Sequence, residues 1–182
     1  CILIEFPDRW RIMIDTGPGM PGRSDLALSV LPWLRREGII SLDAVLLTHG
    51  HADHTGGAAD LAAAIDIRCW YVGGSASPEQ VRCLPGTEGR WLSRGSVIHR
   101  HGPWSLVCRY QPGQSAEECS ENDLSTVIGL YHDDRLLAVW GGDLEAEGEA
   151  KLLAEDTCPP QERIQLWKAG HHGSRTSGSQ AY

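Results

Sequence analysis

One short segment constrains this chain more than any other, because three histidines and one aspartate lie within six residues, directly after the apolar run 44–47. These four residues are His49, His51, Asp53 and His54. Borderline divalent ions such as zinc bind imidazole nitrogen and carboxylate oxygen. In an extended segment His49 and His51 point to one face, whereas the adjacent Asp53 and His54 can both reach a metal only if the chain turns. Such a turn gives two ligand pairs, so we predict a site for two metal ions. The alternative is a chance cluster of surface histidines, which four potential ligands in six positions disfavour.

Composition sets limits on the partners of the chain. Its 182 residues correspond to about one domain with a real core, so we expect a single domain over 1–182. Sixteen basic and 24 acidic residues give a net charge of −8, which argues against a broad cationic surface for nucleic acid or acidic lipid. An anionic substrate would therefore be attracted locally, by metal ions or a small basic patch. No apolar run approaches the roughly 18 residues of a membrane span, so we expect this piece to be soluble.

The six cysteines form no C-x-x-C pair, which disfavours a zinc knuckle or a thioredoxin-like redox site. We expect free, buried thiols. Disulfides such as Cys69 to Cys83 or Cys108 to Cys119 are the alternative, since loops of these lengths close easily.

Strand-like and helix-like segments alternate along the chain. A helix is expected to begin at Ser24, with Arg35 and Arg36 in its last turn. The other expected helices are 58–65 and 145–155, and the expected strands are 1–6, 10–14, 42–48, 67–72, 96–99, 105–110, 125–131, 136–140 and 164–168. The chain starts inside a strand and stops soon after a motif-like segment, so we expect a fragment truncated at both ends.

Two further strand ends carry residues suited to metal chemistry. Asp143 follows the strand 136–140 through two glycines, and its carboxylate could bridge two cations; a turn aspartate that caps the next helix is the alternative. His171 and His172 follow the strand 164–168, and could supply one metal ligand and one group facing substrate. Lys168 and the hydroxyls after His172 could contact a phosphate, unless this stretch is only a flexible tail.

Other polar residues are assigned less chemistry. Asp15, at the end of the strand 10–14, is expected to hold the metal loop through hydrogen bonds rather than to bind metal. His99 and His101 are expected in solvated positions, and His132 in a hairpin turn.

The order of these motifs resembles the metallo-β-lactamase fold superfamily. The motifs are Asp15-Thr16-Gly17, His49-x-His51-x-Asp53-His54, Gly142-Asp143 and His171-His172-Gly173-Ser174. Two further patterns look most like the C-terminal domain of ComEC-type DNA-internalisation competence proteins, namely Lys168-x-x-His171-His172-Gly173-Ser174-x-x-Ser177 and Asn122-x-x-Ser125. The resemblance covers nearly the whole chain. It implies an α/β fold, a four-layer αββα metallo-β-lactamase-like sandwich.

The resemblance also implies a dinuclear site of two divalent metal ions, Zn or Mn. His49 and His51 would hold one ion, Asp53, His54 and His172 the other, and Asp143 would bridge them. His171 would face substrate, and Asn122, Ser125, Ser174 and Ser177 would contribute substrate contacts. The third histidine that many members give to the first ion is absent from 121–125, so that ion would bind weakly or use Asn122, Asp123 or water.

The function implied is a metal-dependent phosphodiesterase that cleaves single-stranded DNA during uptake in natural transformation. Asp53 would accept a proton from water, and His171 and Lys168 would neutralise charge on the substrate. The domain would lie outside the cytoplasmic membrane, attached to a membrane-spanning channel domain of the same longer polypeptide, and would need no nucleotide cofactor. The alternatives are another hydrolase on this scaffold, such as a phosphorylcholine esterase or a lactamase, and a non-catalytic module that guides DNA into a channel.

Overall fold

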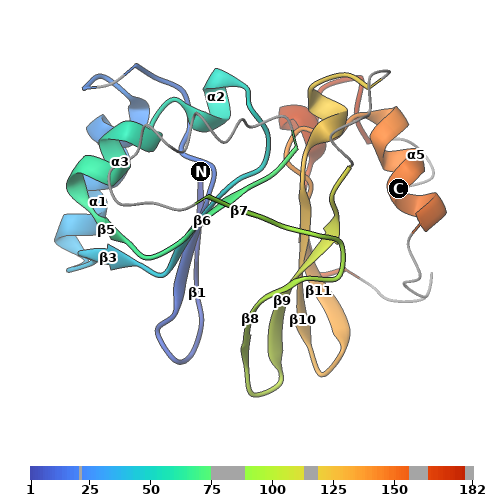
Figure 1. Cartoon of the computed structure of the whole chain (residues 1–182), viewed down its shortest axis with the longest axis horizontal. Coiled ribbons are helices and arrows are strands. Elements are labelled where there is room, and N and C mark those ends of the chain that lie inside the picture. The colour runs from blue at the N-terminus through green and yellow to red at the C-terminus, as the bar shows by residue number, and fades with distance from the viewer. Residues whose placement is uncertain (21, 75–88, 113–118, 156–163, 179–182) are drawn as a thin grey trace. The chain divides into compact units, whose positions relative to one another are not determined.

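The computed structural model describes residues 1–20, 22–74, 89–112, 119–155 and 164–178. The chain divides into two compact units, Cys1–Trp91 and Leu92–Tyr182. Each unit contains one five-stranded sheet with helical segments (Figure 1). We describe each unit by itself.

The sheet of the first unit is mostly parallel and has the strand order β1-β2-β4-β6-β7. Its strands are β1 (Ile2–Glu5), β2 (Arg11–Ile14), β4 (Ala44–Leu47), β6 (Trp70–Val72) and β7 (Gly89–Trp91). Only the β1/β2 hairpin is antiparallel. A separate parallel pair is formed by β3 (Ser41–Leu42) and β5 (Asp66–Ile67). Because β2, β4 and β6 run in parallel, their carboxyl ends meet at one edge of the sheet.

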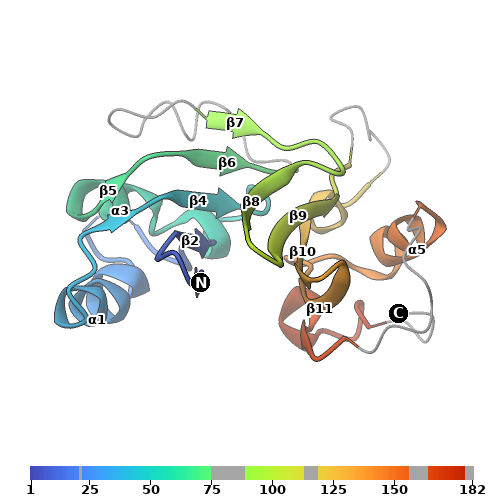
Figure 2. The same cartoon turned by 90° about the horizontal axis from the view of Figure 1, so that it is seen from below.

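Three helical segments of the first unit, η1 (Leu26–Val30), α1 (Leu31–Arg36) and α3 (Ala58–Ala64), pack on one face of this sheet (Figure 2). The short helix α2 (Ala52–Thr55) instead lies beyond the ends of the strands (Figure 1). Leu34 from α1 and Leu61 from α3 are fully buried with Val45 and Trp70, which are paired in the sheet. The burial of this apolar face provides most of the driving force for the unit.

The predicted helix that begins at Ser24 forms as two segments. Its first part, η1, is a π-helical turn in which the N–H of Leu31 donates to the carbonyl of Leu26. Pro32 follows directly, and a proline has no N–H with which to continue an α-helical ladder. The wider turn ahead of Pro32 therefore has a local cause in the sequence.

The sheet of the second unit is mostly antiparallel and has the strand order β12-β11-β10-β9-β8. Its strands are β8 (Val97–His101), β9 (Trp104–Tyr110), β10 (Val127–His132), β11 (Arg135–Trp140) and β12 (Leu166–Lys168). The helical segments are η2 (Asn122–Leu124), α5 (Ala146–Glu155) and η3 (Gly170–Gly173). β12 pairs in parallel with β11, so the segments that follow these two strands leave from the same edge.

Helix α5 is joined to the sheet by apolar packing and by a distant cap. Leu152 of α5 packs with Tyr110, Val127 and Val139 of the sheet. The carboxylate of the buried Asp123 accepts hydrogen bonds from the N–H groups of Glu145 and Gly148, at 3.0 and 2.9 Å. Asp123 therefore satisfies the free donors at the start of α5, as a local N-cap residue would.

The predicted elements are present with shifted ends, except that the predicted strand 67–72 forms as β5 and β6 in different sheets. The short segments β3, α2, η2 and η3 and the strand β7 were not predicted. Cys69, Cys108 and Cys119 are free, so the proposed Cys108–Cys119 bridge is not formed. Burial raises the pKa of the Cys108 thiol to about 12. Cys83 lies outside the described residues. In the part of the chain that the structure describes, no helix is both long and apolar enough to cross a bilayer.

Candidate metal-binding segments

The histidine-rich segment of the first unit folds into a compact group of imidazoles after β4. His49 and His51 lie in the bent segment between this strand and α2, and His54 lies in α2. The ring centroid of His49 is 4.8 Å from that of His51 and 4.2 Å from that of His54. The chain turns into α2 directly after His51, as predicted, and brings the three imidazoles together. His49 is 0% exposed and His54 3%.

Asp15 fixes the orientation of this group from the end of β2. Its carboxylate accepts hydrogen bonds from the N–H of Thr48 at 2.8 Å and from the hydroxyl of Thr48 at 3.0 Å. Its other oxygen lies 2.7 Å from Nδ1 of His54. A carboxylate accepts, so Nδ1 of His54 donates and Nε2 keeps the lone pair that a metal needs. Asp15 thus orients a ligand, and its own φ of 56° is a strained value that this contact compensates.

Close backbone packing holds α2 against the loop after β2. The carbonyl of His54 accepts hydrogen bonds from the N–H and the hydroxyl of Thr16, at 2.7 and 2.9 Å. A Cβ on Gly56 would lie 2.5 Å from the nitrogen of Gly19, and one on Gly57 would lie 2.5 Å from the carbonyl oxygen of Thr16. Only glycine allows this approach. Asp53 has a half-exposed side chain, with Oδ2 3.7 Å from Nε2 of His54.

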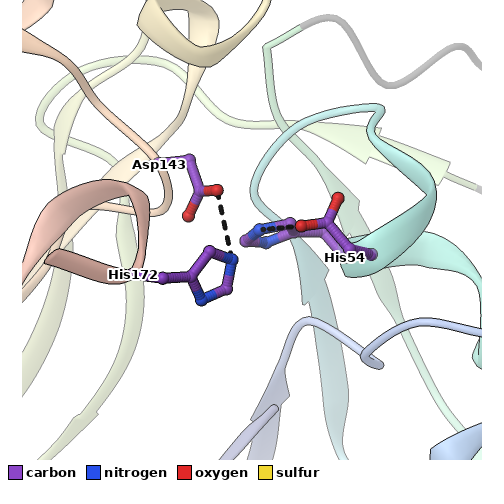
Figure 3. A group of neighbouring side chains, drawn as sticks. His54, Asp143 and His172 are labelled. Carbon is purple, nitrogen blue, oxygen red and sulfur yellow. Dashed lines mark ion pairs between the residues drawn. The ribbon is translucent and has the colours of Figure 1, made fainter. Parts of the chain in front are cut away.

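The second unit places Asp143 beside His172. Oδ2 of Asp143 lies 3.3 Å from Nε2 of His172 (Figure 3). Asp143 is 1% exposed, and its N–H donates to the hydroxyl of Ser125 at 3.0 Å. Ser125 is fully buried, so its hydroxyl holds Asp143 from within the fold.

Lys168 is also directed to the Asp143 loop. Its ammonium donates to the carbonyls of Gly142 and Ala169, at 2.8 and 3.2 Å, and lies 3.6 Å from Oδ1 of Asp143. Two of the three ammonium donors are thus engaged by backbone carbonyls, and the Asp143 carboxylate lies within ion-pair distance. Lys168 therefore stabilises the Asp143 loop, which is a role that the sequence did not predict.

The turn that carries the two histidines is strained. His171 has φ 42° and His172 has φ 52°, both in the left-handed region that non-glycine residues rarely adopt. The hydroxyl of Ser177 donates to the carbonyls of Gly170 and Ser174, at 2.7 and 3.1 Å. Ser177 thus ties the two ends of this turn together, and the partly buried Ser174 contacts the hydroxyl of Thr176 at 3.0 Å.

Glu145 is the main residue that sequence reasoning missed. Its Oε1 accepts a hydrogen bond from the hydroxyl of Thr176 at 2.7 Å and lies 2.8 Å from Nδ1 of His171. The amide of Asn122 donates to the same oxygen at 3.3 Å. These contacts, led by the Thr176 hydroxyl, lower the pKa of Glu145 below its usual value. A lone Glu at the start of a helix is ordinary, so its role had no separate sequence signal.

The residues predicted to contact substrate have different surroundings in the structure. The amide nitrogen of Asn122 is bound to Glu145, whereas its oxygen Oδ1 is buried and accepts no hydrogen bond from the described residues. His171 is partly exposed but anchored through Nδ1 to Glu145. Asp123, which the sequence offered as an alternative ligand, is engaged in the cap of α5.

The residues present fit divalent metal ions. The first unit offers imidazole nitrogens with one ligand oriented by a carboxylate, which is the usual outer-shell arrangement of metal-bound histidine. The second unit offers a buried carboxylate and an imidazole in contact. Nitrogen and carboxylate oxygen suit zinc and manganese alike.

The chain is similar in sequence to several known proteins. Residues 1–82 match the family described as the metallo-beta-lactamase superfamily. Over its length the chain is similar to Recombination protein 2 of Haemophilus influenzae, with 31% identity over 93% of this chain and 19% of the relative. It is also similar to ComE operon protein 3 of Bacillus subtilis, with 27% identity over 96% of this chain and 24% of the relative. The chain thus spans about a fifth to a quarter of these relatives.

Solved structures show the same fold. The metallo-β-lactamase SMB-1 superposes with a TM-score of 0.61 over 93% of this chain and 72% of that chain, at 18% sequence identity. The mixed α/β fold with its two main sheets is therefore the fold implied by the sequence motifs. Residues 1–82 thus match the metallo-beta-lactamase superfamily in sequence, and the likeness to SMB-1 extends the fold over 93% of the chain.

Proposed function

We propose that this chain is a metal-dependent phosphodiesterase that cleaves single-stranded DNA during DNA uptake. In this proposal His49 and His51 hold one divalent ion, Asp53, His54 and His172 hold a second, and Asp143 bridges them. The observation that best supports the proposal is that neighbouring residues already hold the proposed ligands in position. Asp15 orients His54 in the first unit, and Ser125 and Lys168 hold Asp143 in the second.

The proposed chemistry needs little from the chain beyond positioning and proton transfer. Two bound divalent ions would lower the pKa of water and neutralise charge that develops on a phosphate. Asp53 accepts the proton of the attacking water, since its side chain is half exposed at the edge of the imidazole group. Lys168 keeps a positive charge beside Asp143, and His171 faces the substrate while Glu145 holds its Nδ1.

An acidic chain can still act on an anionic polymer. The net charge is −8, but two divalent cations reverse the local field where a phosphate binds. Binding should therefore depend on the metal site rather than on a basic surface.

The link to DNA uptake is supported by similarity over nearly the whole chain. The two relatives match 93% and 96% of it, and the motif from Lys168 to Ser177 resembles that of ComEC-type proteins. We propose that the chain is the extracytoplasmic part of a longer polypeptide with a membrane-spanning channel domain. DNA is then its substrate, and no nucleotide cofactor is needed.

The test is cleavage of single-stranded DNA by the purified chain with Mn²⁺ or Zn²⁺. We expect metal-dependent cleavage that falls by at least about a hundredfold in Asp143→Ala, because that carboxylate serves both ions. Asp25→Ala is the matched control, since Asp25 is exposed and makes no side-chain cap contact. Cleavage that is undiminished in Asp143→Ala would end the proposal. Faster turnover of a phosphorylcholine ester or a β-lactam than of bis(p-nitrophenyl) phosphate would favour another hydrolase.

A second candidate is a non-catalytic module that guides DNA into a channel. It is favoured by the segment 121–125, which has no histidine to complete the first ion's ligands. Metal content separates the two candidates. Two ions per chain support the enzyme, whereas less than one ion per chain supports the module.

A further inference from the structure

We propose that Glu145 is a positioning residue that holds the His171–His172 turn and thereby presents His172 to Asp143. The inference rests on the proposed function, because it takes His172 and Asp143 as metal ligands. It concerns only residues of the second unit, and it adds a residue that neither the sequence motifs nor the family pattern assigned.

The Glu145 carboxylate contacts two segments that are distant from it in sequence. Its Oε1 lies 2.8 Å from His171 within the turn and 2.7 Å from Thr176 just after it, and it accepts from Asn122 of η2 at 3.3 Å. Its own backbone N–H is fixed by the buried Asp123. The backbone of Glu145 is therefore fixed, which limits how far its carboxylate can move.

The turn needs such support because its backbone is unfavourable. Two successive non-glycine residues, His171 and His172, occupy the left-handed region. Such conformations persist where surrounding contacts over-determine them, and they cluster at functional sites. Glu145 binds the side chain of the first of these residues.

Backbone contacts place the turn directly on the start of α5. The N–H of Ala146 donates to the carbonyl of Thr176 at 2.8 Å. A Cβ on Gly170 would lie 2.4 Å from the carbonyl oxygen of Leu144, so this glycine allows the turn to sit against the Leu144 backbone. The turn is thus held at both of its ends and, through Glu145, at its middle.

The two proposed ligands differ in how they are held. Asp143 is fixed by the Ser125 hydroxyl and by Lys168, independently of Glu145. His172 has a side chain that is 60% exposed, and its position depends on the turn. Loss of Glu145 should therefore release His172 and leave Asp143 in place.

The experiment is a calorimetric titration of the metal-free full chain with Mn²⁺ and with Zn²⁺. Glu145→Ala should weaken binding of one ion by about tenfold to a hundredfold, as for other residues that orient metal ligands. Glu145→Gln keeps an oxygen acceptor and should recover affinity to within a few fold of wild type. Glu147→Ala is the matched control, because Glu147 lies on the same helix and its exposed side chain contacts Lys151.

A double-mutant cycle distinguishes positioning from general destabilisation. If Glu145 acts through His172, then Glu145→Ala should cause no further loss of affinity in a His172→Ala background. Thr176→Val removes the shortest contact of Glu145 from an exposed position, and should give a smaller loss in the same direction. It decides the question if Glu145→Ala fails to fold.

The inference is overturned if Glu145→Ala, or Thr176→Val in its place, binds both ions within twofold of wild type. It is also overturned if the losses of Glu145→Ala and His172→Ala add in full. Metal binding without DNA cleavage in the wild type would remove the proposed function and leave this inference standing. A wild-type chain that binds neither ion would overturn both.

Discussion

The ligand segments of the two units differ in how much of the chain is needed to build them. In the first unit, one run from His49 to His54 contains all the proposed ligands, and the buried Asp15 binds His54 through a hydrogen bond. In the second unit, Asp143 and His172 follow different strands and are held by Ser125, Lys168 and Glu145. The His54 side chain is 4% exposed and the His172 side chain 60%. We infer that the histidine-rich segment of the first unit is rigid, whereas the position of His172 in the second unit is adjustable.

The largest effect is expected when the Asp15 carboxylate is removed from the first unit. Asp15→Ala leaves the N–H of Thr48 and Nδ1 of His54 buried without their acceptor. We expect the free energy of unfolding of the metal-free chain to fall by about 3 kcal/mol. Urea denaturation measures this, with Asp25→Ala as the control. A loss below about 0.5 kcal/mol would contradict the rigidity of the histidine-rich segment in the first unit.

A pair of glycine substitutions compares the packing around the two segments. A Cβ on Gly56 would meet backbone atoms of Gly19 and Ala52 within 2.6 Å, whereas a Cβ on Gly141 would meet no atom within 4 Å. We expect Gly56→Ala to cost about 2 kcal/mol of unfolding free energy and Gly141→Ala less than about 0.5 kcal/mol. Equal effects in denaturant titrations would show that the difference in packing does not exist.

Removal of the distant cap tests how far the second unit depends on long-range contacts. Asp123→Ala leaves the N–H groups of Glu145 and Gly148 without an acceptor at the start of α5. The expected cost is about 1 to 2 kcal/mol, the usual value for an N-cap. Asp123→Asn keeps one acceptor oxygen and should cost less than Asp123→Ala in the same urea titration. The reverse order would refute the capping role.

The smallest effect concerns acid stability of the first unit. Hydrogen bonds from the Ser24 hydroxyl, followed by the Gly22 N–H, lower the pKa of Asp60 below 3.8. Because the folded pKa is depressed, this contribution to stability is present above the unfolded pKa and is lost as the pH falls through the folded pKa. Asp60→Asn should therefore differ most from wild type above about pH 4 and converge with it below. Thermal melting between pH 6 and pH 2.5 measures this, and a constant difference across that range would contradict it.

The same contrast explains what the sequence could predict. The contiguous run from His49 to His54 carried its own signal, and so did Asp143 after its glycines. The contacts of Glu145, Thr176 and Asp123 join residues far apart in sequence, so no local pattern contains them. Lys168 was assigned to substrate because its charge is visible in the sequence, whereas the carbonyls that engage it are set by the paths of β11 and β12.

The elements were predictable where apolar periodicity was strong, and less so elsewhere. The strand Ala44–Leu47 is buried at every position, and its pattern indicated it directly. β7 was missed because Gly89, Arg90 and Trp91 are all exposed and give no alternation. The predicted helix at Ser24 begins as a π-helical turn, because Pro32 has no N–H to donate. The apolar pattern indicated a helix but not this break in its hydrogen bonding.

The left-handed backbone at residues 171 and 172 limits which amino acids a mutagenesis library can place there. Isoleucine, valine and threonine are poorly tolerated at such dihedral angles, whereas asparagine, aspartate and glycine enter them at low cost. Functional selection at these two positions should therefore return a narrow set of side chains even where bulk and polarity would permit more. If His172 binds metal as proposed, variants intended to change the metal preference are best confined to asparagine and aspartate at this position.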